Sequence, residues 1–200
     1  MDSTIDYYNK RAKEYYERTV GVDMSHLCEK FLNYIKDGGH ILDLGCGSGR
    51  DSLYFIEQGY KVTPIDGSLE MVKFSSRLLG QKVLHMKFSE LNFNKEFNGI
   101  WACASLLHVS KENIYSVIRK LLKALKEDGI IYISFKYGKG EEKIKERLFS
   151  YYTKGEIKKL IARFSRLEIV EVWRTADQEK RKKDWLNVLV RKKWSFLDRI

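Results

Sequence analysis

One nine-residue segment constrains the fold of this chain more than any other. Residues 41–49 read Ile-Leu-Asp-Leu-Gly-Cys-Gly-Ser-Gly, an apolar stretch of strand type followed at once by three glycines in five residues. Glycines at this spacing let the backbone turn sharply and let a ligand approach bare main chain. The residues after Gly49 begin a helix, whose first N–H groups are free and carry a partial positive charge. The segment therefore predicts a strand–turn–helix unit that binds a ligand at the turn.

The rest of the chain alternates between strand and helix patterns. Such alternation builds right-handed βαβ units, so we expect an α/β fold with a doubly wound, mostly parallel sheet and helices on both faces. Pro64 fits poorly inside a parallel strand, because it cannot donate a ladder hydrogen bond. The expected strands cover residues 41–44, 60–65, 83–87, 99–104, 130–135, 167–173 and 186–190, and the expected helices cover 4–18, 24–35, 50–58, 69–78, 111–126, 142–149 and 154–164.

Length and composition favour one ordinary globular domain. The chain has 200 residues, 44% of them apolar and 32% charged, which is enough to bury a core without a disulfide or a structural metal. Its three cysteines show no paired short spacing, which suits a reducing compartment. We see neither a secretory signal nor an apolar run long enough for a membrane span. The expected location is the cytoplasm.

The positive charge is concentrated in the last third of the sequence. Residues 1–135 contain 18 Lys/Arg and 17 Asp/Glu, whereas residues 136–200 contain 19 and 10. Two basic runs with nearby tryptophans, at 179–184 and 191–194, are of a type that can bind nucleic acid. The alternative is a solvated surface that keeps the protein in solution.

Two acids distinguish between possible ligands of the glycine turn. A dinucleotide fingerprint needs Gly-x-Gly-x-x-Gly, but here the third glycine comes one residue early and Arg50 follows it. Asp43 lies two residues before the first glycine, where a carboxylate would repel a pyrophosphate and could accept from an ammonium group. Asp66 ends the next strand, the usual place for a carboxylate that accepts from ribose hydroxyls.

These motifs resemble those of the class I S-adenosylmethionine-dependent methyltransferases, especially the small bacterial ones. The resemblance runs from about residue 8 to residue 190 and includes the Tyr-x-x-x-Ala-x-x-Tyr pattern at Tyr8, Ala12 and Tyr15. It implies that S-adenosylmethionine is the cofactor, that the turn wraps its methionine part and that Asp66 holds its ribose. The cofactor-binding residues it implies are Tyr15, Asp43, Gly45, Cys46, Gly47, Gly49, Asp66, Gly67, Ser68, Met71, Phe88, Ser89, Glu90 and Cys103.

The resemblance also implies a seven-stranded, Rossmann-like sheet whose last strand is antiparallel. The whole chain, 1–200, then forms a single domain: a helical cap over the active site at 1–36, a core at 37–193 and a tail at 194–200. Two positions depart from the family pattern: Lys87 stands where an acid often precedes Phe88, and Asn98 stands where the family usually has Asp. Taken by themselves, Cys46 and Cys103 read as small buried residues rather than nucleophiles.

Candidate substrate-side residues follow the fourth and fifth strands. His108 could act as a base or orient the acceptor, or it could be a structural residue near the next helix. Lys136 and Tyr137 could bind an anionic acceptor, or could be a snorkelling lysine and a packed tyrosine. We expect no metal, because no closely spaced His/Cys/Asp set is visible.

These observations predict an enzyme that methylates a small molecule of polar or anionic character. One alternative is an RNA or other nucleic-acid methyltransferase that uses the basic C-terminal third. A second is a cofactor-binding module without catalysis. The sequence does not single out the acceptor, because one fold of this kind supports many reactions.

Overall fold

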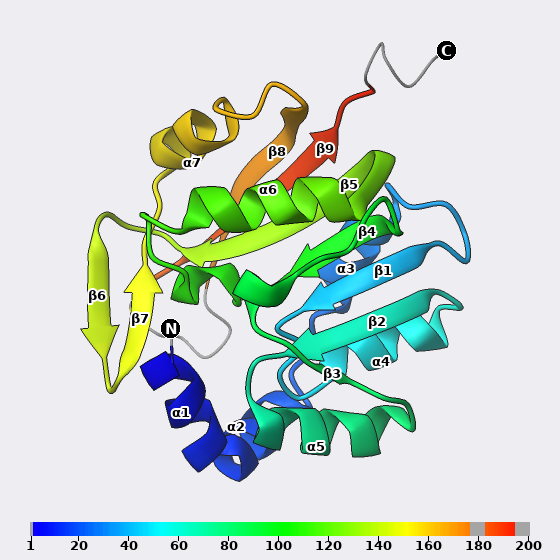
Figure 1. The fold of residues 1–200 in the computed structure, drawn as a ribbon, viewed down its shortest axis with the longest axis vertical. Helices are drawn as coiled ribbons and strands as arrows, with labels where there is room; N and C mark the ends of the chain where they lie inside the picture. The colour runs from blue at the N-terminus through cyan, green and yellow to red at the C-terminus, as the bar shows by residue number, and fades with distance from the viewer. Residues whose placement is uncertain (1, 177–182, 195–200) are drawn as a thin grey trace.

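The computed structural model describes residues 2–176 and 183–194, which form one α/β unit (Figure 1). Its centre is a seven-stranded sheet in the order β3-β2-β1-β4-β5-β9-β8. The first five strands are parallel, and β9 runs antiparallel to both of its neighbours. The strands are β1 (His40–Leu44), β2 (Lys61–Asp66), β3 (Leu84–His85), β4 (Phe97–Ala102), β5 (Leu125–Lys136), β8 (Leu167–Thr175) and β9 (Trp185–Lys192). The predicted seven-stranded, doubly wound sheet with an antiparallel last strand is confirmed.

Helices cover both faces of this sheet, as α6 in front and α3 behind show in Figure 1. Successive residues of a strand point to opposite faces. In β1, Leu42 and Leu44 therefore belong to the core on the face of α6 and α7, while Ile41 belongs to the core on the other face, with Phe31 of α3. The helices are α1 (Asp2–Lys10), α2 (Ala12–Thr19), α3 (Ser25–Leu32), α4 (Arg50–Glu57), α5 (Leu69–Leu79), α6 (Ile114–Ala124) and α7 (Lys154–Ile161), with short 3₁₀ turns η1 (Phe88–Glu90) and η2 (Leu106–His108).

Pro64 lies inside β2, opposite Asp43 of β1. The neighbouring Ile65 carbonyl accepts from Gly45 and Cys46, so Ile65 faces β1 and Pro64 faces the other edge. On that edge β3 pairs with β2 only at Ile65 and Asp66. The missing N–H of Pro64 therefore faces a stretch of edge that has no partner strand.

The N-terminal helix predicted for residues 4–18 is two helices. α1 and α2 are separated at Arg11, whose φ of −122° and ψ of 20° are not helical. The break lets α1 turn toward α5, where the Asn9 side chain accepts from Ser68 Oγ at 2.7 Å and from the Glu70 N–H at 3.3 Å. A periodic pattern in the sequence gives no sign of such a bend, because both halves keep helical spacing.

The helix predicted for residues 142–149 is wrong. This segment is a hairpin of β6 (Glu141–Ile144) and β7 (Arg147–Ser150), joined by a two-residue turn. Lys145 and Glu146 have φ values of 47° and 67°, the sign that a type I′ hairpin turn requires and that residues other than glycine adopt at a cost. The hairpin is held by distant partners: Ser150 Oγ donates to the Val109 carbonyl at 2.8 Å, and the Leu148 N–H donates to Thr4 Oγ1 at 3.1 Å.

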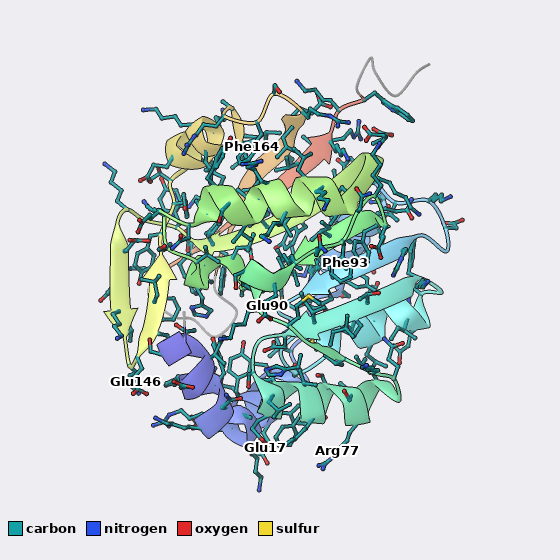
Figure 2. All side chains as sticks on the ribbon, viewed as in Figure 1. Glu17, Arg77, Glu90, Phe93, Glu146 and Phe164 are labelled. Atoms are coloured by element: carbon teal, nitrogen blue, oxygen red, sulfur yellow. The ribbon has the colours of Figure 1, made fainter. Side chains whose placement is uncertain are left out.

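Charged side chains such as Glu17, Arg77 and Glu146 lie on the outside of the molecule (Figure 2). The Glu146 carbonyl also accepts from Ser3 Oγ at 2.9 Å, so the tip of the hairpin is tied to the start of α1. Within residues 2–176 and 183–194, no helix is long and apolar enough to cross a bilayer. The basic run at 180–182 lies outside the described residues.

Candidate active site

Three neighbouring cavities lie at the carboxyl ends of β1, β2 and β4. We name them cavity A, between α1, the glycine turn and η1; cavity B, under α2 beside β1 and β9; and cavity C, between α2, η2 and the β6–β7 hairpin. Tyr15 and Ala104 line all three, so the cavities meet at these two residues. Ligands of doubly wound sheets bind at this edge.

Bare backbone separates cavity A from cavity B. Gly45 and Gly47 line both cavities and have φ values of 77° and 54°, which favour glycine. A Cβ at Gly45 would lie 2.7 Å from Ser105 Cβ, whereas a Cβ at Gly47 would lie 3.5 Å from the Tyr15 ring. Gly49 stands behind the turn, where it precedes α4 with a φ of 83°. The turn thus exposes main chain to whatever fills the two cavities.

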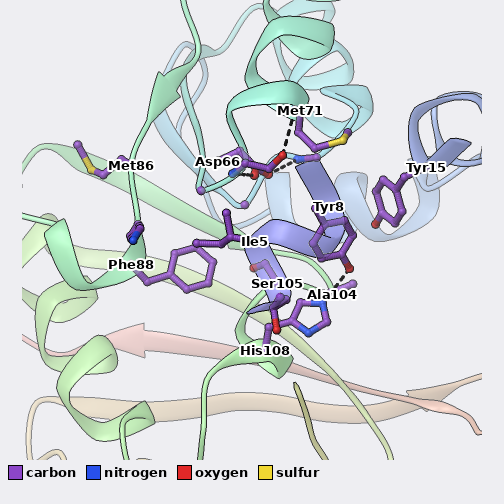
Figure 3. Close-up of a pocket in the computed structure, with 16 residues that line it drawn as sticks. Ile5, Tyr8, Tyr15, Asp66, Met71, Met86, Phe88, Ala104, Ser105 and His108 are labelled. Carbon is purple, nitrogen blue, oxygen red and sulfur yellow. Dashed lines mark hydrogen bonds between the residues drawn. The ribbon is translucent and has the colours of Figure 1, made fainter. Parts of the chain in front are cut away.

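Asp66 lies at the end of β2 and faces cavity A, as Figure 3 shows. Its two carboxylate oxygens accept from the N–H groups of Gly47 at 2.9 Å and Ser68 at 2.8 Å. Burial raises the pKa of this carboxyl, against the lowering effect of those hydrogen bonds. Each oxygen has a second lone pair, so the carboxylate can still accept from ligand hydroxyls.

The other side of cavity A is apolar. Phe88 of η1 lies across from the glycine turn, with Met71 and Met86 nearby, and Ile5 of α1 packs against Gly67 (Figure 3). The predicted residues Ser89 and Glu90 do not line any of the three cavities. Glu90 instead accepts from the Lys87 N–H at 2.8 Å and caps η1.

Asp43 lines cavity B and is buried, with 2% of its surface exposed. Its carboxylate accepts from Ser52 Oγ at 2.6 Å. Burial, followed by the nearby Asp51 charge, raises its pKa to about 8. A cationic ligand group in cavity B would therefore favour the ionised form of Asp43.

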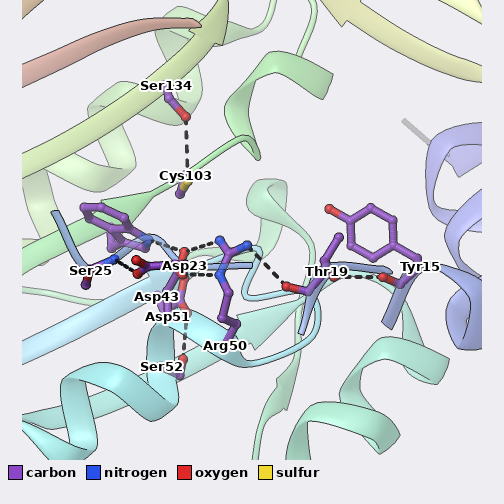
Figure 4. A network of polar contacts seen from close by, with 11 residues as sticks. Tyr15, Thr19, Asp23, Ser25, Asp43, Arg50, Asp51, Ser52, Cys103 and Ser134 are labelled. Carbon is purple, nitrogen blue, oxygen red and sulfur yellow. Dashed lines mark hydrogen bonds and ion pairs between the residues drawn. The ribbon is translucent and has the colours of Figure 1, made fainter. Parts of the chain in front are cut away.

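Arg50 and Asp51 form a second polar cluster in cavity B that the sequence analysis missed (Figure 4). Two guanidinium nitrogens donate to the Asp51 oxygens at 2.6 and 3.0 Å, and Trp101 Nε1 donates to Asp51 Oδ2 at 2.8 Å. Arg50 also reaches the Thr19 carbonyl at 3.4 Å, which ties α4 to α2. Trp101 is 50 residues from Asp51, so no local spacing could have indicated this contact.

Two residues at the exit of β4 mark the place where the cavities join. Ala104 has a φ of 51°, an uncommon value for a residue with a Cβ, and its N–H donates to Ser134 Oγ at 2.7 Å. Ser105 Oγ lines cavity A and is buried without a hydrogen-bond partner within the described part of the chain. A buried hydroxyl without a partner is rare in a folded protein and fits a site that a polar ligand completes.

His108 lines cavities A and C and has a defined tautomer. The Leu148 carbonyl, 2.6 Å from Nδ1, can only accept, so Nδ1 carries the proton and donates to it. Nε2 then accepts from the Tyr8 hydroxyl at 2.9 Å. Burial, together with the nearby Arg147 charge, lowers the pKa of His108 to about 4. The imidazole is therefore neutral at pH 7 and links α1, η2 and β7.

The remaining predicted residues are spread around this centre. Lys136 lines cavity C, where its Nζ lies 3.8 Å from the centroid of the Trp185 ring. Tyr137 lines none of the three cavities, and Arg174 stacks on its ring at 4.0 Å. Cys46 and Cys103 line cavity B, and burial raises the pKa of both thiols, that of Cys103 to about 12. Neither cysteine is a reactive thiolate at neutral pH.

The comparisons with known proteins agree with this geometry. A family model described as a methyltransferase domain matches residues 41–129, which include the glycine turn and Asp66. An uncharacterised methyltransferase of Staphylococcus carnosus is 26% identical over 160 residues, which is 76% of each chain. These matches support a class I S-adenosylmethionine-dependent methyltransferase.

Solved structures of two methyltransferases show the same fold. The 1,6-didemethyltoxoflavin-N1-methyltransferase of Burkholderia thailandensis, with bound 1,6-didemethyltoxoflavin and S-adenosylhomocysteine, has a TM-score of 0.73 at 23% identity, covering 96% of this chain and 85% of that one. Magnesium protoporphyrin IX methyltransferase from Synechocystis, with bound S-adenosylhomocysteine, has a TM-score of 0.74 at 14% identity, covering 94% and 97%.

The putative methyltransferase YqeM of Bacillus subtilis is 30% identical over 104 residues, and this match spans only 42% of that protein. The cofactor of the methyltransferase is S-adenosylmethionine, and its site fits this ligand. The glycine turn, the carboxylate of Asp66 and the unpaired Ser105 hydroxyl together form a cradle for a polar nucleoside. Within the described ranges, no group of three or more His, Cys, Asp or Glu residues is arranged to hold a metal ion.

Proposed function

We propose that this methyltransferase modifies a small, polar acceptor that binds in cavity C. The observation that carries the proposal is the junction of the three cavities at Tyr15 and Ala104. Cavity A matches the ribose and base of the cofactor in polarity, and cavity B matches its amino-acid part. Cavity C is then left for the acceptor. With a volume of about 340 Å³, cavity C suits a small molecule rather than a macromolecule.

We assign the cofactor contacts from the cavity linings. In cavity A, Asp66 accepts from the ribose hydroxyls, and Phe88, Met71 and Met86 surround the base. In cavity B, Asp43 and the backbone of the glycine turn face the amino-acid part. The N-terminal helices then act as a cap, because Ile5 and Tyr8 of α1 and Tyr15 of α2 cover these cavities.

The cofactor supplies a methyl group already activated by a sulfonium, and the chain has to align the acceptor and exclude water. Tyr15 and Ala104 form the passage through which the acceptor reaches the methyl carbon. When bound, the cofactor would give its methyl carbon to the acceptor atom as the carbon–sulfur bond breaks, which would leave S-adenosylhomocysteine as the second product. Tyr8 and His108 border the passage on the side of cavity C.

We propose that His108 positions Tyr8 rather than removing a proton from the acceptor. Its Nε2 lone pair is occupied by the Tyr8 hydroxyl, and its pKa of about 4 makes it a weak base. Lys136 contributes positive charge to the wall of cavity C. Tyr137 has no part in this assignment, because it lies outside the cavity.

The experiment has two stages. Calorimetry first measures S-adenosylhomocysteine binding, for which we expect a micromolar dissociation constant; a labelled methyl donor is then incubated with a metabolite extract. The Gly47→Ala variant places a methyl group beside Tyr15 in the cradle, whereas Gly80→Ala places one in open space at the end of α5. Both positions have positive φ, so both changes destabilise by about 1 kcal/mol, but only the first weakens binding, at least tenfold. Equal affinities of the two variants would contradict the assignment of the cradle.

The two alternative functions have less support. The basic run at 180–182 lies outside the described residues, and no contact in the described part favours a nucleic-acid acceptor. A fold of this kind also carries other chemistry, since the structure of the [4+2]-cyclase SpnF has a TM-score of 0.68 with this chain at 20% identity. Cofactor binding without methyl transfer to any acceptor in the extract would favour the non-catalytic module.

A further inference from the structure

The β6–β7 hairpin places in cavity C a cation that the proposed methyl transfer does not use. Arg147 is the first residue of β7 and lines the cavity beside Tyr8 and His108. Its guanidinium carbon lies 4.3 Å from the centroid of the Tyr7 ring and 5.0 Å from that of Phe149. The ring of Tyr8 is 5.9 Å away. Rings on several sides hold the guanidinium in one orientation.

Arg147 forms no ion pair with any residue in the described ranges, although it is partly buried. Its Nε is buried without a hydrogen-bond partner there. Lys183 of the same cavity differs, because its Nζ lies 3.8 Å from the Glu142 carboxylate. Glu142 also accepts from the Tyr151 hydroxyl at 2.9 Å, which holds this acid at the Lys183 side of the cavity. The guanidinium also interacts with the Tyr8 hydroxyl. Arg147 is thus a fixed cation whose side chain lines a space where a small molecule can bind.

We propose that Arg147 binds a carboxylate of the methyl acceptor, and that this acceptor is a small aromatic acid. This inference rests on the function proposed above, because it assigns the substrate class of cavity C. A guanidinium offers two parallel donors that match the two oxygens of a carboxylate. Aromatic side chains form much of the remaining wall, namely Tyr15, Phe149, Tyr151 and Trp185. Such rings pack well against a flat aromatic ligand.

A carboxylate fits better than a phosphate. A phosphate carries close to two negative charges and three acceptor oxygens, and proteins usually meet it with several donors. Of the other cations that line cavity C, Lys183 faces Glu142, Lys136 lies over the Trp185 ring and Arg18 lies over the Tyr15 ring. The imidazole of His108 is neutral, and its Nδ1 proton is used by the Leu148 carbonyl. One guanidinium therefore balances one negative charge.

The test uses benzoate, the simplest aromatic carboxylate, on the full-length protein saturated with S-adenosylhomocysteine. Benzamide is its uncharged match, and phenyl phosphate is the alternative oxyanion. Nuclear magnetic resonance follows the arginine Nε–H signals, and that of Arg147 is identified by its loss in Arg147→Met. We expect benzoate to shift this signal to saturation and benzamide to bind at least tenfold more weakly. Arg147→Met should weaken benzoate binding at least tenfold and leave the affinity for S-adenosylhomocysteine unchanged.

Two further variants distinguish the effect of the paired guanidinium donors from the effect of the charge alone and from that of packing on the Tyr7 ring. Arg147→Lys keeps the charge without the paired donors and should bind benzoate with intermediate affinity, a readout that stands even if the Met variant folds poorly. Arg11→Met is the matched control, since Arg11 stacks at 5.3 Å on the same Tyr7 ring but pairs with Glu14 outside cavity C. Its benzoate affinity should equal that of the unmodified protein.

Three results would overturn the inference: no benzoate binding to the S-adenosylhomocysteine complex, equal binding of benzoate and benzamide, or unchanged benzoate affinity in Arg147→Met. Tighter binding of phenyl phosphate than of benzoate would overturn the choice of a carboxylate. If S-adenosylhomocysteine itself does not bind, the proposed function fails at its first step, and the inference fails with it. Cofactor binding without benzoate binding refutes only the role of Arg147.

Discussion

Replacing Asp66 by Ala tests the central contact of the proposed cofactor site. Each Asp66 oxygen already accepts one backbone N–H, from Gly47 or Ser68, and keeps one lone pair for a ligand hydroxyl. A hydrogen bond to a charged group contributes about 1.5–3 kcal/mol. Since water will occupy part of the space left by the carboxylate, we expect a net loss of about 2–3 kcal/mol, or roughly 30- to 150-fold in the dissociation constant.

The same change has two opposite effects on folding. Gly47 and Ser68 lose their acceptor, which costs about 1 kcal/mol for each bond. Removing a buried carboxyl whose pKa is raised also removes a desolvation penalty, which offsets part of this loss. The free energy of unfolding should therefore fall by less than about 2 kcal/mol, and the variant should remain folded at 25 °C.

Calorimetry with S-adenosylhomocysteine at pH 7.5 measures the first effect, and urea unfolding measures the second. Glu90→Ala is the control, because the family resemblance predicts a cofactor contact for Glu90 whereas its carboxylate caps η1 outside cavity A. Its affinity should stay within twofold of the unmodified protein. An unchanged dissociation constant for Asp66→Ala, in a variant shown to be folded, would refute the assignment of Asp66 to the ribose.

Three further changes address the groups around the site. Asp43→Asn should stabilise the ligand-free protein by about 1–3 kcal/mol at pH 8, because the folded pKa of Asp43 is raised to about 8 and ionising the carboxyl opposes folding. The variant should nevertheless bind S-adenosylmethionine more weakly. Equal thermal stability of the two proteins at pH 8 would count against this prediction. The pKa of His108 is lowered to about 4 from an ordinary 6.5, so its contribution to stability is present above pH 6.5 and is lost as pH falls toward 4. His108→Gln should therefore reduce the pH dependence of the free energy of unfolding over that range. An unchanged pH profile would exclude a neutral buried imidazole. Lys192→Met should lower the free energy of unfolding in urea by about 1–3 kcal/mol, because the buried Nζ lies 3.0 Å from Glu127 and donates to the Leu125 carbonyl, while Glu127 keeps Arg166 as a partner. An unchanged free energy of unfolding would show that the pair is dispensable.

The sequence was most informative where local pattern and tertiary environment agree. The strand–turn–helix at residues 41–57 combines buried strand residues, required glycines and a helix start within one short segment. The Asp66 position follows from the same logic, because parallel strands bring their carboxyl ends to one edge. These local rules were sufficient for the order of elements in the cofactor half, whereas the family resemblance indicated only about a third of the residues that line cavities A and B.

The hairpin at residues 141–150 shows where such rules stop. Its sequence is rich in Glu, Lys and Arg, which favour helix, and its turn contains no glycine. The strands form because Thr4, His108 and Val109, all distant in the sequence, supply their hydrogen-bond partners. Tertiary contacts of this kind override a local preference. Arg147 went unnoticed for the same reason, since a helix would have placed it elsewhere.

The position of β9 has a consequence for the way this protein is made. The last strand lies between β5 and β8, so its residues 185–192 fill an interior place in the sheet. While the ribosome is still adding this segment, the apolar edge of β5 has no neighbour, and an unpaired edge invites association with other chains. A nascent polypeptide of this type therefore gains its protection against aggregation only once residues 185–192 have been added, and termination before residue 185 would release an aggregation-prone product.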